Sequence, residues 1–171
     1  PPAIVIQTPP ENSITNDNTP TYTGTTEPYL TVVVKVDGVP IDTVVADGSG
    51  NWTTTQPTPL PDGPHTVSAT ATDPYGNSAT DTNPFTVDTT PPTIVIDTPV
   101  DGSTITDNTP LYTGTTEPNL TVIVSVDGVP IDTLVANGSG NWSTPQLTAL
   151  PDGPHTVTAL ATDVAGNTAT D

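Results

Sequence analysis

Hydrophobic and polar positions alternate with a period of two along residues 65–72. Val67, Ala69 and Ala71 are separated by Thr and Ser, which is the pattern of a β-strand with one buried face. The turn-forming sequence DPYGN follows, and residues 78–87 form a second extended run. Gly and Asn in that turn can adopt the positive φ that a tight hairpin requires. The two runs therefore predict a β-hairpin.

Further short extended runs precede this hairpin. The Asp-Gly pair at 37–38 fits a two-residue hairpin turn, and Pro40, which has no N–H, suits a strand at the edge of a sheet. Residues 8–18 are turn-rich and predict a crossing between strands. Tyr22 and Trp52 fall on the inward phase, so we expect them to be buried with the apolar positions of the hairpin. The other expected strands cover residues 3–6, 19–27, 30–36, 39–46 and 52–55.

The whole pattern occurs twice. Residues 1–81 align with residues 91–171 without a gap, and 58 of the 81 aligned positions are identical. A self-similar period of this length indicates two tandem copies of one fold. We therefore predict two domains, residues 1–90 and residues 91–171, with a linker at 88–92.

Composition supports an all-β fold. Thr, a good strand former, fills 38 of 171 positions, and the chain contains 22 Pro, 13 Gly and no Met. About seven short strands, separated by turns, predict a sandwich of two sheets in each repeat. Residues 82–90 have no counterpart after Asp171, so we expect the final strand of the second repeat to be truncated.

The charge balance argues against anionic partners. The chain has 19 acidic residues, a single Lys, no Arg and a net charge of −18. With a single Lys the chain has too few cations to neutralise phosphates, so we expect no binding to nucleic acid or to anionic membrane. No apolar run reaches the roughly 18 residues of a membrane helix. We therefore expect no membrane insertion in this segment, with any signal or anchor lying outside it.

Several motifs recur in both repeats and carry a resemblance. They are YTGTTEP, VDGVPI, GSGNW and LPDGPHTV, and VDTTPP links the two copies. Together they resemble the bacterial Ig-like repeats of large secreted or surface-anchored adhesins. The resemblance implies two immunoglobulin-like β-sandwiches arranged end to end, a secreted or cell-surface location, and a role as spacer or stalk. It also implies calcium at the domain junctions in some members, and no enzymatic activity.

The sandwich topology implied by this resemblance indicates which carboxylates would lie close together. The linker at 88–92 would lie beside two loops of the second repeat, so that Asp88, Glu117 and Asp163 converge. These are hard oxygen ligands, and Asn167 would help to complete the shell of a Ca²⁺ ion. We therefore expect a junction calcium site formed by these four residues.

The first repeat contains the equivalent half-site, Glu27 and Asp73, without an upstream linker. A simpler alternative is open for the second repeat: Asp163 and Asn167 could cap their own turn through local bonds to backbone. We interpret the remaining acidic residues as turn residues on solvated loops, for example Asp37, Asp62, Asp127 and Asp152.

Other candidates for chemistry have simpler readings. His65 and His155 each follow a PDGP turn, with no nucleophile or second His at a suitable spacing, and read as polar residues at the start of a strand. Trp52 and Trp142 could stack on a sugar, but a repeated aromatic in a small all-β domain more often belongs to the core. No phosphate loop or Cys/His cluster occurs, and we expect no enzyme.

The expected function is a structural stalk or spacer segment of a bacterial cell-surface or extracellular adhesin or fibre. Its partners would be neighbouring Ig-like repeats of the same or an adjacent chain. One alternative is an extracellular filament subunit, in which a segment such as 3–6 completes the truncated repeat of a neighbour. The other is a carbohydrate-binding or accessory module of a secreted hydrolase, which exposed Trp52 and Trp142 would favour. The sequence names no specific cell-surface or carbohydrate partner.

Overall fold

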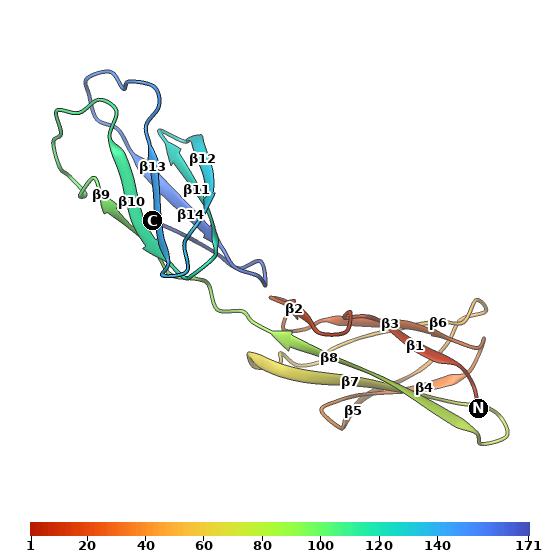
Figure 1. The fold of residues 1–171 in the computed structure, drawn as a ribbon. Coiled ribbons are helices and arrows are strands. Elements are labelled where there is room, and N and C mark those ends of the chain that lie inside the picture. The colour runs from red at the N-terminus through yellow and green to blue at the C-terminus, as the bar shows by residue number, and fades with distance from the viewer. The chain divides into compact units, whose positions relative to one another are not determined.

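The computed structural model describes all residues from Pro1 to Asp171. They form two compact units, Pro1–Thr89 and Thr90–Asp171, called here the first and second unit (Figure 1). Every regular element is a β-strand, which confirms the predicted all-β fold. No helix that could cross a membrane is present.

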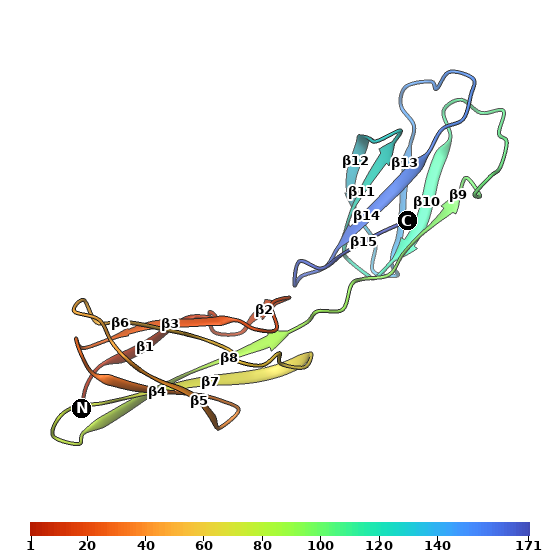
Figure 2. The ribbon, with the colours of Figure 1, turned by 180° about the vertical axis from the view of Figure 1, so that it is seen from behind.

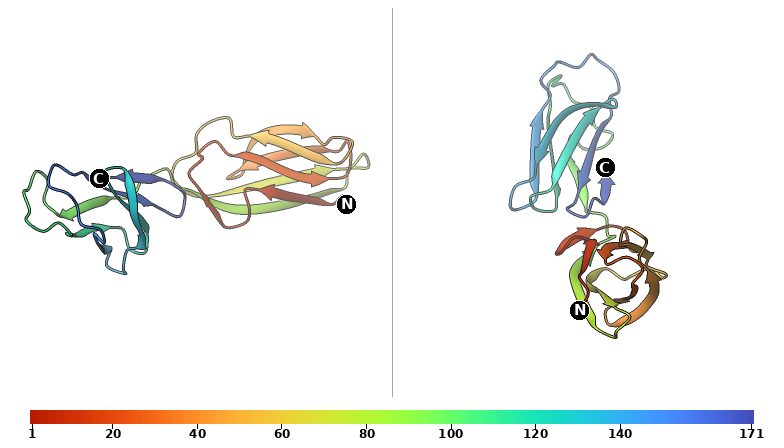
Figure 3. Two further views of the ribbon diagram at one scale, coloured as in Figure 1. Left: turned by 90° about the horizontal axis from the view of Figure 1, so that it is seen from above. Right: turned by 90° about the vertical axis from the view of Figure 1, so that its right-hand side faces the viewer.

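The first unit is a sandwich of two sheets. The smaller sheet has the order β1-β3-β6 and the larger one β2-β8-β7-β4-β5. Figure 3 (right) looks roughly along these strands, and the two layers enclose the core between them. The strands are β1 (Ile4–Thr8), β2 (Ser13–Thr15), β3 (Thr21–Thr26), β4 (Thr31–Val36), β5 (Val39–Val45), β6 (Asn51–Thr55), β7 (Gly63–Thr72) and β8 (Ser78–Val87).

Local sequence explains most of these elements. Asp37 and Gly38 have φ values of 51° and 80°, as a two-residue hairpin turn between β4 and β5 requires. Pro40 lies in β5, at the edge of the larger sheet, where its missing N–H removes no inner hydrogen bond. The strand β2 was not predicted. It is only three residues long and pairs in parallel with the end of β8, a long-range contact with no periodic pattern.

The core of the first unit confirms the predicted strand phases. The five residues expected inside are all nearly inaccessible: Tyr22, Trp52, Val67, Ala69 and Ala71. Phe85 from β8 packs among them, with its ring centre 6.2 Å from that of Tyr22 in an edge-to-face arrangement and 5.8 Å from that of His65. The small Ala side chains leave room for these rings.

Gly24 in β3 has no space for a side chain. A Cβ placed there would lie 2.1 Å from the carbonyl oxygen of Val5 and 2.3 Å from the ring of Trp52. The indole therefore packs directly on bare backbone. The second unit repeats this arrangement at Gly114 and Trp142.

The second unit has the same two layers (Figure 2). One sheet has the order β13-β10-β9 and the other β12-β11-β14-β15. The strands are β9 (Ile94–Thr98), β10 (Leu111–Thr116), β11 (Thr121–Val126), β12 (Val129–Val135), β13 (Asn141–Pro145), β14 (Val157–Thr162) and β15 (Thr168–Thr170).

The two units differ in the last strand: β8 has ten residues, whereas its counterpart β15 has three and ends one residue before Asp171, the last residue of the sequence. Whereas β7 begins at Gly63, its counterpart β14 begins only at Val157. Among the expected core residues of this unit, Tyr112, Trp142, Ala159 and Ala161 are buried. The prediction is wrong for Val157, which is only half-buried, since the sequence does not include the counterpart of Asn83, which pairs with Val67 in the first unit.

Candidate functional site

Asp163 lies in the turn between β14 and β15 and is bonded to that turn. Its Oδ1 accepts from the backbone N–H of Asn167 at 2.8 Å, and its Oδ2 accepts from the Asn167 side-chain amide at 2.9 Å. Partial burial acts to raise the pKa of Asp163, but the hydrogen bonds from Asn167, together with those from the backbone of Gly166 and Ala165, outweigh it and lower the pKa below its usual value. Both residues therefore cap their own turn, as the simpler reading described.

The equivalent turn in the first unit is built in the same way. The side-chain amide of Asn77 donates to Oδ2 of Asp73 at 2.7 Å, and the Asn77 backbone N–H donates to Oδ1 at 2.8 Å. The side-chain bond from Asn77 is the main cause that lowers the pKa of Asp73 below its usual value. The carboxylate is thus a turn cap that stays ionised at neutral pH.

The other expected ligands are placed within each unit as follows. Oε1 of Glu117 lies 3.3 Å from the backbone N–H of Thr93, which donates to it. Asp88 follows β8, and its backbone N–H donates to Thr15 O at 2.9 Å. No group of three or more acidic, His or Cys side chains that could hold a metal comes together within either unit. The donor types match those of a calcium site, and the junction site remains a proposal.

His65 joins two loops of the first unit. Its Nδ1 donates to Oδ2 of Asp37 at 2.7 Å, and its Nε2 donates to the carbonyl oxygen of Pro61 at 2.8 Å. A carboxylate and a carbonyl only accept hydrogen bonds, so both contacts are hydrogen bonds at the same time only when both ring nitrogens carry a proton and the imidazole is cationic. Oδ1 of the same carboxylate accepts from the backbone of Thr66 at 2.9 Å. We call this ion pair with its two supporting bonds the His–Asp clip.

The charge state of the clip follows from competing effects. Burial disfavours the charged ring, but the hydrogen bonds to Asp37 and Pro61 outweigh it and raise the pKa of His65 above its ordinary 6.5. Burial likewise acts to raise the pKa of Asp37, whereas the bonds from His65 and Thr66 lower it below 3.8. Each partner therefore favours the ionised form of the other.

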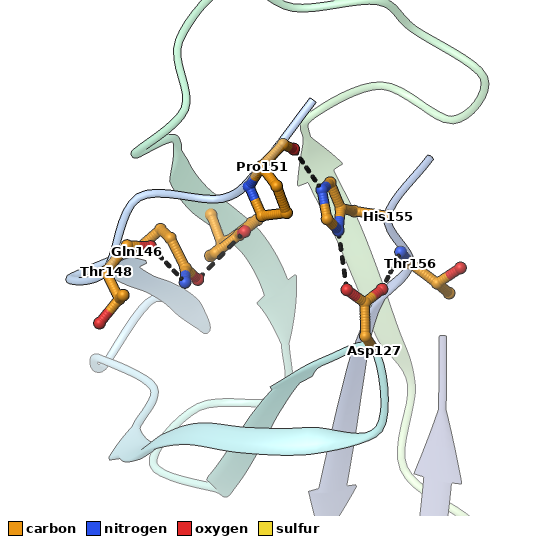
Figure 4. A network of polar contacts seen from close by, with 7 residues as sticks. Asp127, Gln146, Thr148, Pro151, His155 and Thr156 are labelled. Carbon is orange, nitrogen blue, oxygen red and sulfur yellow. Dashed lines mark hydrogen bonds and ion pairs between the residues drawn. The ribbon is translucent and has the colours of Figure 1, made fainter. Parts of the chain in front are cut away.

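The second unit contains the same clip (Figure 4). His155 Nδ1 donates to Oδ2 of Asp127 at 2.7 Å, and its Nε2 donates to Pro151 O at 2.8 Å. The bond to Pro151 and the bond to Asp127 both raise the pKa of His155. Asp37 and Asp127 lie in exposed turns, as predicted, and each also holds a histidine in place, which was not predicted.

The stability of the first unit should depend on pH through the ionisation of its His–Asp clip. The pKa of His65 is higher in the folded state, so its contribution to stability is full below about pH 6.5 and is lost as pH rises through the folded value. We expect the melting temperature of the first unit to fall across this range. His65→Gln should flatten the fall, while His155→Gln should leave the first unit unchanged. If the melting temperature of the first unit fell equally steeply above pH 6.5 in the parent and in His65→Gln, this result would contradict the clip.

Sequence reasoning missed this clip because its two members are far apart along the chain. Asp and His are separated by 28 positions in both repeats, and that shared spacing was the only available sign. With 58 of 81 aligned positions identical, a repeated pair stands out little from its surroundings. The contact arises only when the β4–β5 turn meets the start of β7.

The tryptophans belong to the core, as predicted. Trp52 and Trp142 are each 3% exposed, so neither indole face is available to stack on a sugar. The most exposed aromatic side chains are instead Tyr29 and Tyr75, on loops of the first unit. The second repeat has Asn119 and Ala165 in their places. An aromatic platform is therefore not a shared feature of the two copies.

Comparison with known proteins identifies the family. Residues 8–89 and 96–171 both match the bacterial Ig-like domain family. No curated protein is similar to the chain in sequence.

Several solved structures resemble the chain over 99% of its length. A tetra-tandem repeat from the extending region of a large adhesion protein is 27% identical, with a TM-score of 0.40. A Ca²⁺-stabilized adhesin with which an Antarctic bacterium binds ice is 19% identical, with a TM-score of 0.48. A 1.5-MDa bacterial ice-binding adhesin is 19% identical, with a TM-score of 0.45.

The chain spans 47%, 46% and 63% of the lengths of these three structures, in the same order. Since all three TM-scores are below 0.5, the family assignment rests on the sequence match. That match covers one complete segment in each unit. The chain therefore belongs to the bacterial Ig-like domain family and carries two tandem copies of the domain.

Proposed function

We propose that this chain is a stalk or spacer segment of a bacterial cell-surface or extracellular adhesin or fibre. The observation that carries the proposal is the tandem repetition of a whole sandwich, in which each unit has its own apolar core and its own His–Asp clip. A domain with its own core can be added in series without a new partner. Neighbouring repeats of the same or an adjacent chain are the expected partners.

The spacer role predicts that length grows with copy number. Pro91 and Pro92 in the linker favour an extended, semi-rigid path. Small-angle scattering of the present chain and of a chain with four copies should give maximum dimensions that rise nearly in proportion to the number of copies. A four-copy chain that scatters as a compact globule would contradict the spacer role.

We also propose that Asp88, Glu117, Asp163 and Asn167 bind calcium at the linker, with Glu27 and Asp73 as the equivalent half-site. Support comes from the donor chemistry, since carboxylate and amide oxygens are the ligands that Ca²⁺ prefers. The lowered pKa of Asp163 keeps its carboxylate ionised. The net charge of −18 further favours uptake of a cation.

Calcium should therefore stabilise the chain. We expect the melting temperature to rise with the logarithm of calcium concentration above the dissociation constant. Asp88→Asn should abolish this rise, while Asp101→Asn, an equal change of charge at an exposed loop position of the second unit, should preserve it. The absence of binding heat at millimolar calcium would contradict the proposed site. An equal rise of the melting temperature with calcium in the two variants would contradict it as well.

The two alternative functions receive less support. Donation of residues 3–6 to a neighbour would detach β1, which pairs with β3 and buries Ile6 in the core of its own unit. A carbohydrate-binding module would need an exposed aromatic platform, and both Trp side chains are buried. The stalk reading requires neither rearrangement nor an additional surface.

A further inference from the structure

The turn between β12 and β13 contains the only Asn-Gly pair of the chain, Asn137 and Gly138. Both residues are exposed. In such a pair the backbone nitrogen of the glycine can attack the side-chain carbonyl carbon of the asparagine, because no glycine side chain obstructs the approach. The asparagine is then converted to aspartate through a cyclic imide. This turn is therefore a candidate site for a spontaneous covalent modification.

The aligned position of the first repeat is already an aspartate, Asp47. Oδ1 of Asp47 accepts hydrogen bonds from the backbone N–H groups two and four positions later, at 2.8 and 2.9 Å. Oδ1 of Asn137 accepts from the same two positions of its own turn, at 2.9 and 3.0 Å. The first unit therefore shows the folded turn that conversion of Asn137 produces.

A carboxylate makes one contact in this turn that an amide cannot make. The side-chain amide of Asn51 donates to Oδ2 of Asp47 at 3.1 Å. In the second unit the corresponding atom of Asn137 is an amide nitrogen, which is itself a donor and cannot accept from Asn141. The bonds from Asn51, first that from its backbone N–H, lower the pKa of Asp47 below its usual value. Conversion of Asn137 thus adds a hydrogen bond to an ionised carboxylate.

The hydrogen bonds that hold Asn137 also favour the first step of the reaction. Attack by the Gly138 nitrogen on Cγ moves electron density from the C=O bond onto Oδ1, and two backbone N–H groups already donate to this oxygen. Donors in place at a developing oxyanion lower the barrier to such an addition. The Gly138 nitrogen loses its proton to solvent, and the amide nitrogen of Asn137 leaves as ammonia, which closes the imide.

Water then opens the imide at one of its two carbonyl carbons. Attack at the former side-chain carbon restores the normal backbone and gives aspartate, whereas attack at the backbone carbon gives isoaspartate, whose main chain is longer. The turn is closed by two backbone bonds, from Gly140 N to Asn137 O at 2.8 Å and from Asn137 N to Asn141 O at 2.9 Å. Because a longer main chain disrupts both bonds, the folded turn favours aspartate.

The fold does not require glycine at position 138. A Cβ on Gly138 would meet no atom within 4 Å, and the residue does not have a positive φ. Gly140 in the same turn differs, since its φ is 82° and a Cβ would lie 2.1 Å from the carbonyl oxygen of Thr116. A side chain at position 138 can therefore hinder the attacking nitrogen while the turn keeps its structure.

We propose that Asn137 is a modification site, which the folded chain converts to aspartate by attack of the Gly138 nitrogen and hydrolysis of the imide. The second unit thereby acquires the turn that the first unit already has, and the chain gains one negative charge. The modification needs only water as a co-reactant. It goes beyond the spacer function, since it depends on neither calcium nor the number of repeats.

The test follows the purified 171-residue chain over several weeks at neutral pH and physiological temperature. Peptide mapping by mass spectrometry should show conversion of Asn137, mainly to aspartate, while Asn119 and Asn141 remain intact because Leu and Trp follow them. The rate should rise with pH, since the attacking nitrogen must lose its proton. Gly138→Ala should slow the conversion about tenfold or more, because its methyl group hinders the attack.

The Asn137→Asp variant supplies the product for comparison. Its second unit should melt at a higher temperature than that of the fresh parent, and the aged parent should approach the variant. The gain should disappear when Asn141→Ala is present in both chains, because the donor to the new carboxylate oxygen is then lost. The first unit is an internal reference, and its melting temperature should stay the same throughout.

Four results would overturn the proposal. The first is an intact Asn137 in the folded chain after a peptide of residues 136–142 has converted completely, and the second is an equal rate in the parent and in Gly138→Ala. The third is isoaspartate as the main product in the folded chain. The fourth is an Asn137→Asp variant whose second unit is no more stable than that of the parent. None of these outcomes bears on the scattering test of the spacer function.

Discussion

Replacing Phe85 with Ala is expected to destabilise the first unit by about 3–5 kcal/mol, the usual cost of deleting a large buried aromatic side chain. The ring is 2% exposed and contacts Tyr22 and His65. Ala would leave a cavity between two rings whose own positions are fixed by strands β3 and β7. Few single substitutions in this chain should have a larger effect.

Calorimetry would measure this effect with an internal reference. The two units should unfold in separate transitions, since each has its own core. Phe85→Ala should move the transition of the first unit to lower temperature and leave the transition of the second unit in place. Phe85→Leu, which retains most of the volume, should cost less than half as much. If Phe85→Ala moved neither transition, our placement of β8 over the core would be wrong.

Substituting Gly114 with Ala should destabilise the second unit by about 3 kcal/mol or more. A Cβ there would lie 2.1 Å from the carbonyl oxygen of Val95 and 2.2 Å from the ring of Trp142. The first contact involves backbone held in the β9–β10 pairing, so it cannot be relieved by a side-chain rotation. Gly24→Ala should have the same effect on the first unit.

A matched control lies in the same unit. A Cβ on Gly138 would meet nothing within 4 Å, so Gly138→Ala tests the general effect of adding a methyl group to a loop glycine. Urea unfolding monitored by fluorescence should show a large fall in the midpoint for Gly114→Ala. For Gly138→Ala the free energy of unfolding should change by no more than about 0.5 kcal/mol. Comparable midpoints for the two variants would show that the indole does not pack on this backbone.

Much of the fold was predictable from the sequence because the signals were local. The alternation of Val67, Ala69 and Ala71 fixed which face of β7 is buried, and the Asp-Gly pair at 37–38 fixed the β4–β5 turn. The short strand β2 was not predictable, because its pairing with β8 joins segments about 70 positions apart. The partial exposure of Val157 depends on what covers it, a property that its own strand does not encode.

The candidate site was harder to predict for a related reason. Carboxylates could be counted from the sequence, but their roles depend on the donors that the fold brings to them. Asp163 receives hydrogen bonds from Asn167, only four positions away, and local reasoning could anticipate that. Asp37 and Asp127 receive theirs from histidines 28 positions away, and only the assembled sheet reveals them.

The position of β8 also has a mechanical consequence. It ends at Val87, directly before the segment by which the chain leaves the first unit, and pairs along all ten residues with β7 and in parallel with β2 at its end. Tension applied through this segment acts along the strand, whereas its hydrogen bonds lie across it. The bonds are therefore loaded together in shear and must break as a group, so the first unit should resist pulling better than its small core alone would suggest.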